Sequence, residues 1–450
     1  MTDRTCITLA VRIGAARRPD KNSIRIRLNR TLKNFGKVLR GRGIAAVCSV
    51  AATALMAHAL PVEQFGLVIL LHTYIMVIKG FVNFRSFEAI VRFGIPLQEA
   101  DEEDRLKALL RSTIVLDVAA SLFAAAVGVL AVPLVAGALH WDAQLAGWAG
   151  VYSLILLTTP INTGSGILRL YDRFDALGMQ YTVTPLVRVV LVAAAWLLDG
   201  TMFTFILAWG FSFCVGNLYM IVRGLAELKG KLSSPFWQGF HWTDIRTQGS
   251  EFWKFIGVVY WQTSIDLLPK HLSTLLAGSL LGPAAAGLFR LARDAATVLN
   301  QPAVMLREVI FPDLTRAYTR ESVDFARNTF RTAFFAGCAG FVFVLVAFLF
   351  GEQLLRLVGE DYVPAKLLMV LLLVAGSFEL ASASLRAAAY AMGRAADLLR
   401  IHVLGIFFYL VLFFILARAL GLTGPGLAAI FASLFTLSLT MRLVYRQSAT

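Results

Sequence analysis

The chain has 450 residues, of which 58% are apolar and only 16% are charged. Its mean hydropathy is +0.70. Soluble proteins carry about 25% charged residues, so this composition excludes most metabolic enzymes and soluble binding modules and predicts a polytopic membrane protein. The formal net charge is +14, from 42 Lys and Arg against 28 Asp and Glu.

Nearly uncharged runs of about 20 residues predict membrane-spanning helices. Twelve such runs occur in the chain, and the connections on one side of the membrane are short. The sequence therefore predicts an all-α membrane protein with about twelve transmembrane helices. The predicted spans are 43–60, 65–86, 112–137, 145–168, 179–198, 202–222, 252–281, 284–311, 329–350, 365–390, 399–419 and 424–444.

The basic residues follow the predicted topology. When alternate connections are assigned to the cytoplasm, 33 of the 42 Lys and Arg residues fall there, and only Arg356, Lys366 and Arg418 fall outside. This asymmetry follows the positive-inside rule and predicts that both termini are cytoplasmic. The excess charge then records orientation, so nucleic acid is not an expected partner.

The predicted spans divide into two sets of six. We expect a basic cytoplasmic tail over 1–42, an N-terminal lobe over 43–224, a cytoplasmic linker over 225–251 and a C-terminal lobe over 252–450. An internal echo supports the division, because LPVEQFGL at 60–67 and LGPAAAGL at 281–288 join corresponding spans. Transporters are often built from two such repeats around a central site.

The chain also resembles a known family in the order and spacing of short motifs over roughly residues 35 to 445. These are GILR at 166–169, DRFD at 172–175, Pro185 and Arg188, AW at 208–209, LGP at 281–283, FP at 311–312, LLRLVGEDY at 354–362, MGR at 392–394 and GLTG at 421–424. The pattern is similar to the polysaccharide and O-antigen flippases of the multidrug/oligosaccharidyl-lipid/polysaccharide exporter superfamily. The resemblance implies two six-helix lobes in a V that opens alternately to each side of the inner membrane. It also implies movement of a polyprenyl-pyrophosphate-linked oligosaccharide to the outer leaflet.

Charges inside predicted spans are costly and by default face a bundle interior or a wet cavity. Asp266 and Lys270 lie four residues apart, as do Arg290 and Asp294, so each pair can share a helix face as an ion pair. On one interpretation these pairs only neutralise each other and fix the helices. On the other, the surplus cations serve a ligand.

The surplus consists of Lys270, Arg290 and Arg293 with His271, together with two cations without an acid in helical reach, Lys79 and Arg188. A pyrophosphate leaving water needs fixed cationic donors, and the Arg guanidinium matches phosphate oxygens in a planar fork. A net positive cavity therefore suits a lipid-pyrophosphate head. Lys79 lies near the cytoplasmic end of its span, where it can also snorkel to the interface.

Three acids remain. Glu379 lies in the middle of the tenth span with no base near it in sequence. A buried carboxylate there is protonated and inert, paired with another helix, or a coupling site for protons or sodium. Asp117 and Glu88 lie nearer to helix ends, so we expect them to be solvated.

Prolines within spans remove a backbone donor and favour a kink or local unwinding. Pro160, with Gly164 and Gly166 close behind it, makes the fourth span the best hinge candidate.

No catalytic triad spacing, metal-ligand cluster or phosphate-binding glycine loop appears in the sequence, so no catalytic residue, metal or cofactor is expected. The predicted partners are the lipid-linked oligosaccharide and membrane lipids, with the polysaccharide polymerase and export machinery as further candidates. One alternative is an ion-coupled multidrug exporter of the same superfamily. Another is a polytopic enzyme acting on lipid-linked sugars, although such enzymes generally carry a long periplasmic loop and the outer loop here, 351–363, is short.

Overall fold

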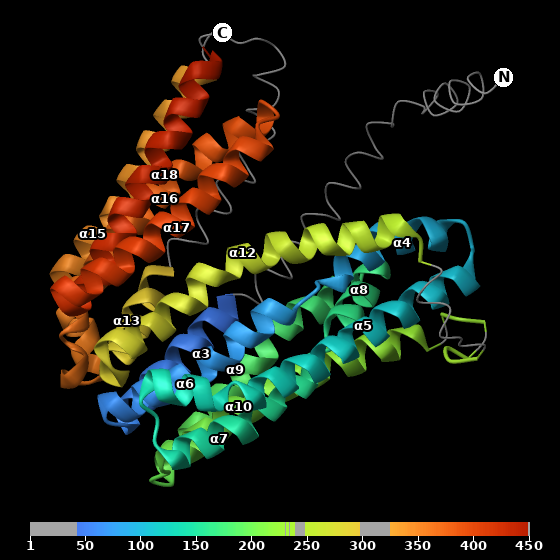
Figure 1. Cartoon of the computed structure of the whole chain (residues 1–450), viewed down its shortest axis with the longest axis horizontal. Coiled ribbons are helices and arrows are strands. Elements are labelled where there is room, and N and C mark those ends of the chain that lie inside the picture. Colours follow the sequence, from blue (N-terminus) through green and yellow to red (C-terminus); the bar gives the residue numbers. More distant parts are fainter. Residues whose placement is uncertain (1–42, 230, 234, 239–247, 298–324, 449–450) are drawn as a thin grey trace.

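The structure is a computed structural model that describes residues 43–448 except 230, 234, 239–247 and 298–324. Inside helices, the side chains of residues 262, 265–270, 325, 326, 447 and 448 also lie outside the description. The described part of the chain consists of helices and their connections (Figure 1).

The N-terminal half begins with a helix at Gly43–Ala59. It continues with α3 (Val62–Val82), α4 (Ser86–Glu99), α5 (Glu103–Leu130), α6 (Val132–Leu139), α7 (Ala143–Ser153), the 3-10 turn η2 (Leu154–Thr158), α8 (Asn162–Leu170), α9 (Phe174–Leu197) and α10 (Met202–Leu228).

The C-terminal half contains α12 (Ser250–Leu281), α13 (Pro283–Ala296), α15 (Phe325–Val358), the 3-10 turn η4 (Glu360–Tyr362), α16 (Ala365–Ala391), α17 (Ala395–Leu420), η5 (Gly421–Thr423) and α18 (Gly424–Ser448).

Membrane-spanning length and composition recur along the chain. Eight described segments qualify: Val62–Glu99, Glu103–Leu130, Ala143–Leu170, Phe174–Leu197, Met202–Leu228, Arg327–Val358, Ala365–Ala391 and Ala395–Arg446. The last of them holds both α17 and α18, and α12 with the helix Gly43–Ala59 account for further predicted spans. The expected span 284–311 begins as α13, and its second part, with Arg307, lies outside the described residues.

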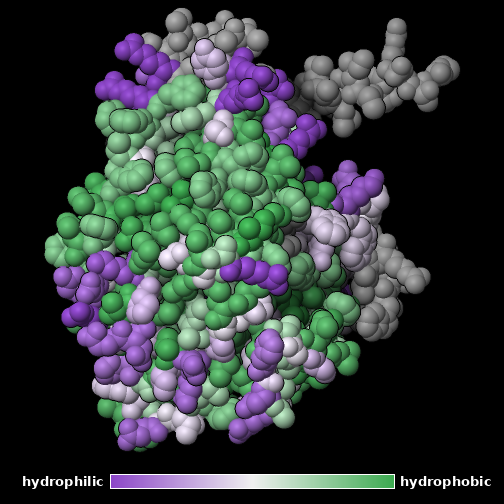
Figure 2. All heavy atoms as spheres, turned by 60° about the vertical axis from the view of Figure 1, so that its left-hand side comes forward, coloured by the Kyte–Doolittle hydropathy of each residue, from purple (hydrophilic) through white to green (hydrophobic). Residues whose placement is uncertain are grey.

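The outer surface of the molecule matches an apolar solvent. Apolar side chains cover most of the face seen in Figure 2, and polar residues gather mainly toward its upper and lower ends. Leu198 and Leu357 are each 80% exposed and Leu134 is 79% exposed. Leaving such side chains in water would forfeit about 1.5 to 3 kcal/mol each relative to burial, so lipid contact is the environment that fits them.

Two of the segments of membrane-spanning length, Val62–Glu99 and Ala143–Leu170, are each broken into separate helices. The helix α3 ends at Val82 and α4 begins at Ser86, while α7 passes through η2 and stops before α8 begins at Asn162. The unwinding around Pro160 confirms the kink predicted there. The sequence did not predict α4, because 87–111 was interpreted as a cytoplasmic connection. The Asn162 side chain donates to Asn83 Oδ1 at 2.9 Å, so the two breaks are joined.

The two halves form a V (Figure 1). The bundle of α15 to α18 leans away from the bundle that contains α4, α5, α8 and α10. The halves meet near the starts of α3 and α13, where the rings of Phe65 and Tyr362 pack edge to face with centroids 5.5 Å apart. We call this the closed end and the opposite end, where α4 lies, the open end.

The contact at the closed end depends on glycine. A Cβ atom on Gly66 would lie 1.9 Å from the Pro283 carbonyl oxygen, and one on Gly287 would lie 2.8 Å from the Phe65 ring. The backbones of α3 and α13 therefore touch, as small residues permit between membrane helices. These two glycines occupy corresponding positions in the internal echo of the sequence.

Substituting Gly66 tests this contact. Gly66→Ala should destabilise the closed end by about 1 to 3 kcal/mol, because overpacking forces the backbones apart. Thermal unfolding of the purified protein followed by size-exclusion chromatography should show a lower midpoint. Gly147→Ala is the matched control, because nothing lies within 4 Å of the added methyl group. An equal loss in both variants would contradict the close approach.

Candidate functional site

Arg188 is held on an aromatic ring in the N-terminal half. Its Cζ atom lies 4.3 Å from the ring centroid of Trp209, and its Nε donates to Ser212 Oγ at 3.2 Å. The arginine belongs to α9 and both partners belong to α10. The ring face attracts the guanidinium without neutralising it, so its charge remains available to an anion.

Lys79 and His72 lie two turns apart on α3 and point to the same aromatic wall. Lys79 Nζ lies 4.6 Å from the centroid of Phe213. The His72 ring lies 6.0 Å from the rings of both Trp209 and Phe213, and its Nδ1 is 2.9 Å from the Tyr152 hydroxyl. The structure thus shows Lys79 against a ring rather than extended toward the interface. His72 was not singled out by the sequence, although its spacing from Lys79 places both on one helix face.

The C-terminal half supplies its own cations through α13. Arg290 Nε and Asp294 Oδ2 are 2.7 Å apart, which confirms the predicted ion pair. Arg293 lies one turn from Arg290, and its Nη1 donates to Thr274 Oγ1 on α12 at 2.9 Å. Its guanidinium also lies 5.6 Å from the centroid of the Phe289 ring.

These cations from the two halves are electrostatic neighbours. His72 interacts with Arg188 and Lys79 of its own half and with Arg290 and His271 of the other. Arg188 likewise interacts with Arg290 and Asp294. The structure thus brings five of the six predicted cationic candidates together. We call the set His72, Lys79, Arg188, His271, Arg290 and Arg293 the central cluster.

The charge of the central cluster is strongly unbalanced. Lys79, Arg188, Arg290 and Arg293 bear four positive charges, and Asp294 is the one acid among the described side chains of the cluster, paired with Arg290 and interacting with Arg188 and Arg293. Like charges brought out of water repel strongly and carry a large desolvation cost. An anionic ligand that enters the cluster relieves the repulsion and offsets part of the desolvation cost.

Three other predicted site residues, Asp266, Lys270 and Glu379, are not among the residues named as the central cluster. Asp266 and Lys270 lie in α12, but their side chains are outside the described ones, so their ion pair stays a prediction. Glu379 in α16 was expected to be buried, and this is wrong because its side chain is exposed. It interacts electrostatically with Tyr409, which in turn neighbours Arg293.

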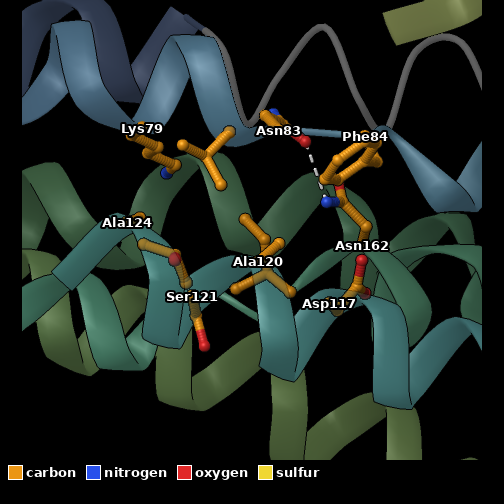
Figure 3. A pocket seen from close by; sticks show the side chains of 11 residues that line it. Lys79, Asn83, Phe84, Asp117, Ala120, Ser121, Ala124 and Asn162 are labelled. Carbon is orange, nitrogen blue, oxygen red and sulfur yellow. Dashed lines mark hydrogen bonds between the residues drawn. The ribbon is translucent and has the colours of Figure 1, made fainter. Parts of the chain in front are cut away.

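A polar pocket lies where the two broken helices meet in the N-terminal half. It is small, with a cavity volume of about 20 Å³. In Figure 3, Asn83 and Asn162 close one side through their hydrogen bond, while Lys79 and Asp117 lie toward opposite ends. A member of the central cluster therefore also lines this pocket.

Asp117 was expected to be solvated, and the structure shows the opposite. Its side chain is 4% exposed. One oxygen accepts from Ser86 Oγ at 2.7 Å, and the other accepts from the backbone N and the hydroxyl of Thr163, both at 2.8 Å. Ser86 begins α4 and Thr163 lies in the first turn of α8. The carboxylate therefore satisfies a backbone donor at the N-terminus of α8, where negative charge is favourable, and holds the first side chain of α4.

Removing this carboxylate should destabilise the N-terminal half. Asp117→Ala leaves buried donors of α4 and α8 without an acceptor, which costs about 1 to 3 kcal/mol for each group. We expect a clear fall in the thermal unfolding midpoint. Asp104→Ala is the control, because Asp104 is an exposed carboxylate on the same helix. Equal midpoints for the two variants would show that Asp117 does not hold the helix breaks.

The chain is similar to known proteins in sequence and in fold. No protein-family model matches the chain. The chain is 25% identical to the inner membrane protein YghQ of Escherichia coli (strain K12) over 324 residues, which covers 72% of this chain and 90% of the relative.

Solved structures share the fold at low sequence identity. An inward-facing multidrug resistance MATE family transporter of the MOP superfamily gives a TM-score of 0.71 at 15% identity, covering 90% of this chain and 94% of the transporter. The lipid II flippase MurJ in an inward closed conformation gives a TM-score of 0.68 at 11% identity, covering 91% of this chain and 87% of the flippase. The chain thus has the V-shaped, all-α polytopic fold of these exporters.

Proposed function

We propose that this protein is an inner-membrane flippase that moves a polyprenyl-pyrophosphate-linked oligosaccharide from the inner to the outer leaflet, for the synthesis of O-antigen, exopolysaccharide or capsule. The observation that carries the proposal is the central cluster, in which four cations from both halves stand against one acid among its described side chains. The fold shared with MurJ, a lipid II flippase by name, and the relation to an inner membrane protein support it.

The chemistry of the cluster fits a pyrophosphate. In this ligand both phosphates are esterified, so the pyrophosphate carries two negative charges, and the cluster carries a surplus of three positive ones when its histidines are neutral. Arg188 and Arg290 stand on opposite halves, so a pyrophosphate between them is held by two planar forks. Aromatic rings support the cations on the protein side and leave the other side to the ligand.

The V shape of the two halves supports transport by alternating access, in which the cavity opens to one side of the membrane at a time. The halves touch at the closed end, where α3 and α13 begin. At the open end the bundle of α15 to α18 leans away from the N-terminal half, while α12 remains packed against α4. The positive-inside count assigns the starts of α3 and α13 to the outer side. On this assignment the structure is the state that accepts substrate from the cytoplasmic side, and both termini are cytoplasmic. The lobes are then 43–224 and 252–450, and Glu379 remains the candidate for ion coupling.

The second candidate is an ion-coupled multidrug exporter, because MATE transporters share the fold. A cationic drug requires carboxylates in the cavity, whereas Asp294, the described acid of the central cluster, is already paired with Arg290. The charge balance therefore favours an anionic substrate over a cationic one.

Neutralising Arg188 tests the proposal. Arg188→Gln keeps a polar side chain beside Ser212 but removes the charge, so translocation should fall by at least about tenfold through loss of a charge-assisted contact. The measurement is flipping of fluorescent undecaprenyl-pyrophosphate oligosaccharide in proteoliposomes, with ethidium efflux assayed in parallel. Normal flipping by this variant would contradict the role of the cluster.

Arg105→Gln is the matched control. Arg105 is an exposed arginine that pairs with Glu102 at 2.8 Å, and its loss removes the same charge away from the central cluster. It should flip lipid at the wild-type rate. Ethidium efflux by the wild type without lipid flipping would favour the multidrug exporter instead.

A further inference from the structure

A second group of cations lies beyond the central cluster, at the break between α3 and α4. Arg85 occupies the break itself in the left-handed backbone conformation, with φ of 45°. A residue other than glycine adopts this backbone conformation at a cost of about 1 to 3 kcal/mol, and residues strained in this way cluster at functional sites. The strained backbone places the Arg85 side chain between α4 and α12, where its Nη1 donates to Thr263 Oγ1 at 3.4 Å.

Two guanidinium groups converge on one phenyl ring beside this break. The Cζ of Arg85 lies 5.0 Å from the centroid of Phe87, and the Cζ of Arg169 lies 4.3 Å from the same centroid. Phe87 belongs to α4 and Arg169 to α8, so the two broken helices contribute together. The two arginines also interact electrostatically with each other.

One acid accompanies this pair of arginines. Glu88 Oε1 lies 3.1 Å from Arg85 Nη2. Among the described side chains, Arg169 has no carboxylate at ion-pair distance, and it donates instead to the Ser165 carbonyl oxygen at 3.0 Å. One positive charge therefore remains uncompensated on a half-buried arginine.

Snorkelling alone does not explain this arrangement. An arginine that only seeks the interface extends its head into water and away from other cations. Here two like charges lie against one ring, so each guanidinium raises the energy of the other by electrostatic repulsion. A phosphate oxygen placed between the two forks converts that repulsion into attraction, because each guanidinium offers several N–H donors.

The position of the pair suggests a route to the central cluster. Arg85 follows Lys79 by six residues along α3 and the break, and Lys79 belongs to the central cluster. Further toward the open end, Arg92 on α4 lies 4.7 Å from the ring centroid of Phe255 on α12. The cations at 79, 85 and 92 thus follow α3, the break and α4 in order, and α4 lies at the open end (Figure 1).

We propose that Arg85 and Arg169, assembled on Phe87, form a second phosphate-binding site that takes the phosphate head of a membrane lipid at the open end before it reaches the central cluster. This inference rests on the proposed function, because it adds an earlier binding site for the same lipid head on its way to the central cluster. The recognised chemistry is a phosphate ester, which a lipid pyrophosphate and an anionic phospholipid share.

The test measures binding of farnesyl pyrophosphate to the full chain in phosphatidylcholine nanodiscs by isothermal titration calorimetry. The wild type should bind two molecules. The double variant Arg85→Gln/Arg169→Gln should bind one, with affinity for the second weakened at least about tenfold by the lost charge-assisted contacts. The double variant Arg188→Gln/Arg290→Gln should retain the other molecule.

Two further variants separate binding from folding. Phe87→Leu keeps an apolar side chain but removes the ring face, so it should weaken the second site about two- to fivefold. Arg105→Gln removes an exposed arginine and should leave both sites unchanged. A repeat in nanodiscs containing phosphatidylglycerol identifies the source: competition only at the second site assigns it to phospholipid heads generally, and no competition assigns it to the pyrophosphate.

The outcomes distinguish this inference from the proposed function. One bound molecule in the wild type that only Arg188→Gln/Arg290→Gln removes would overturn the second site and leave the flippase proposal standing. One bound molecule that only Arg85→Gln/Arg169→Gln removes would support the second site and contradict the central cluster. No binding to the wild type would overturn both.

Discussion

The cost of holding a positive charge away from water governs this structure. A buried ammonium or guanidinium group must find a carboxylate, a ring face or an anion. Arg290 uses a carboxylate, Arg85 uses both a carboxylate and a ring, and Lys79, Arg169 and Arg188 lie on aromatic rings. A ring stabilises the cation without cancelling its charge, so the field of these residues remains directed at whatever enters between the halves.

The same cost explains the helix breaks. A helix that stops inside a membrane exposes backbone donors that lipid cannot satisfy. Asp117 accepts a backbone N–H of α8 from Thr163 and the side-chain hydroxyl of Ser86 at the start of α4, and the amide hydrogen bond between Asn83 and Asn162 ties the breaks together. The continuous helix α5 thus carries the residue that holds two discontinuous ones. The breaks in turn bring Arg85 and Arg169 to the same ring, that of Phe87.

Hydropathy predicted the helices well because lipid imposes a length and composition on each span. The expected span 365–390 is α16 at Ala365–Ala391, and the Arg290 and Asp294 pair followed from helical spacing. The predictions failed where tertiary neighbours decide. Asp117 is buried because segments far away in sequence, at 86 and 163, converge on it, and no local pattern reports this. The helix α4 was missed since its polar residues resemble a loop.

The contact between Gly66 and the start of α13 also limits how the amino-acid sequences of two similar halves can diverge by mutation. If the halves were separate identical subunits meeting about a two-fold axis, one glycine would serve both sides of the contact, and one mutation would alter both. In a single chain the corresponding positions, Gly66 and Gly287, are encoded separately. Each must stay small for the backbones to touch, while their neighbours are free to diverge. The duplicated chain can therefore build a binding surface with different side chains on its two walls, as an asymmetric lipid head requires.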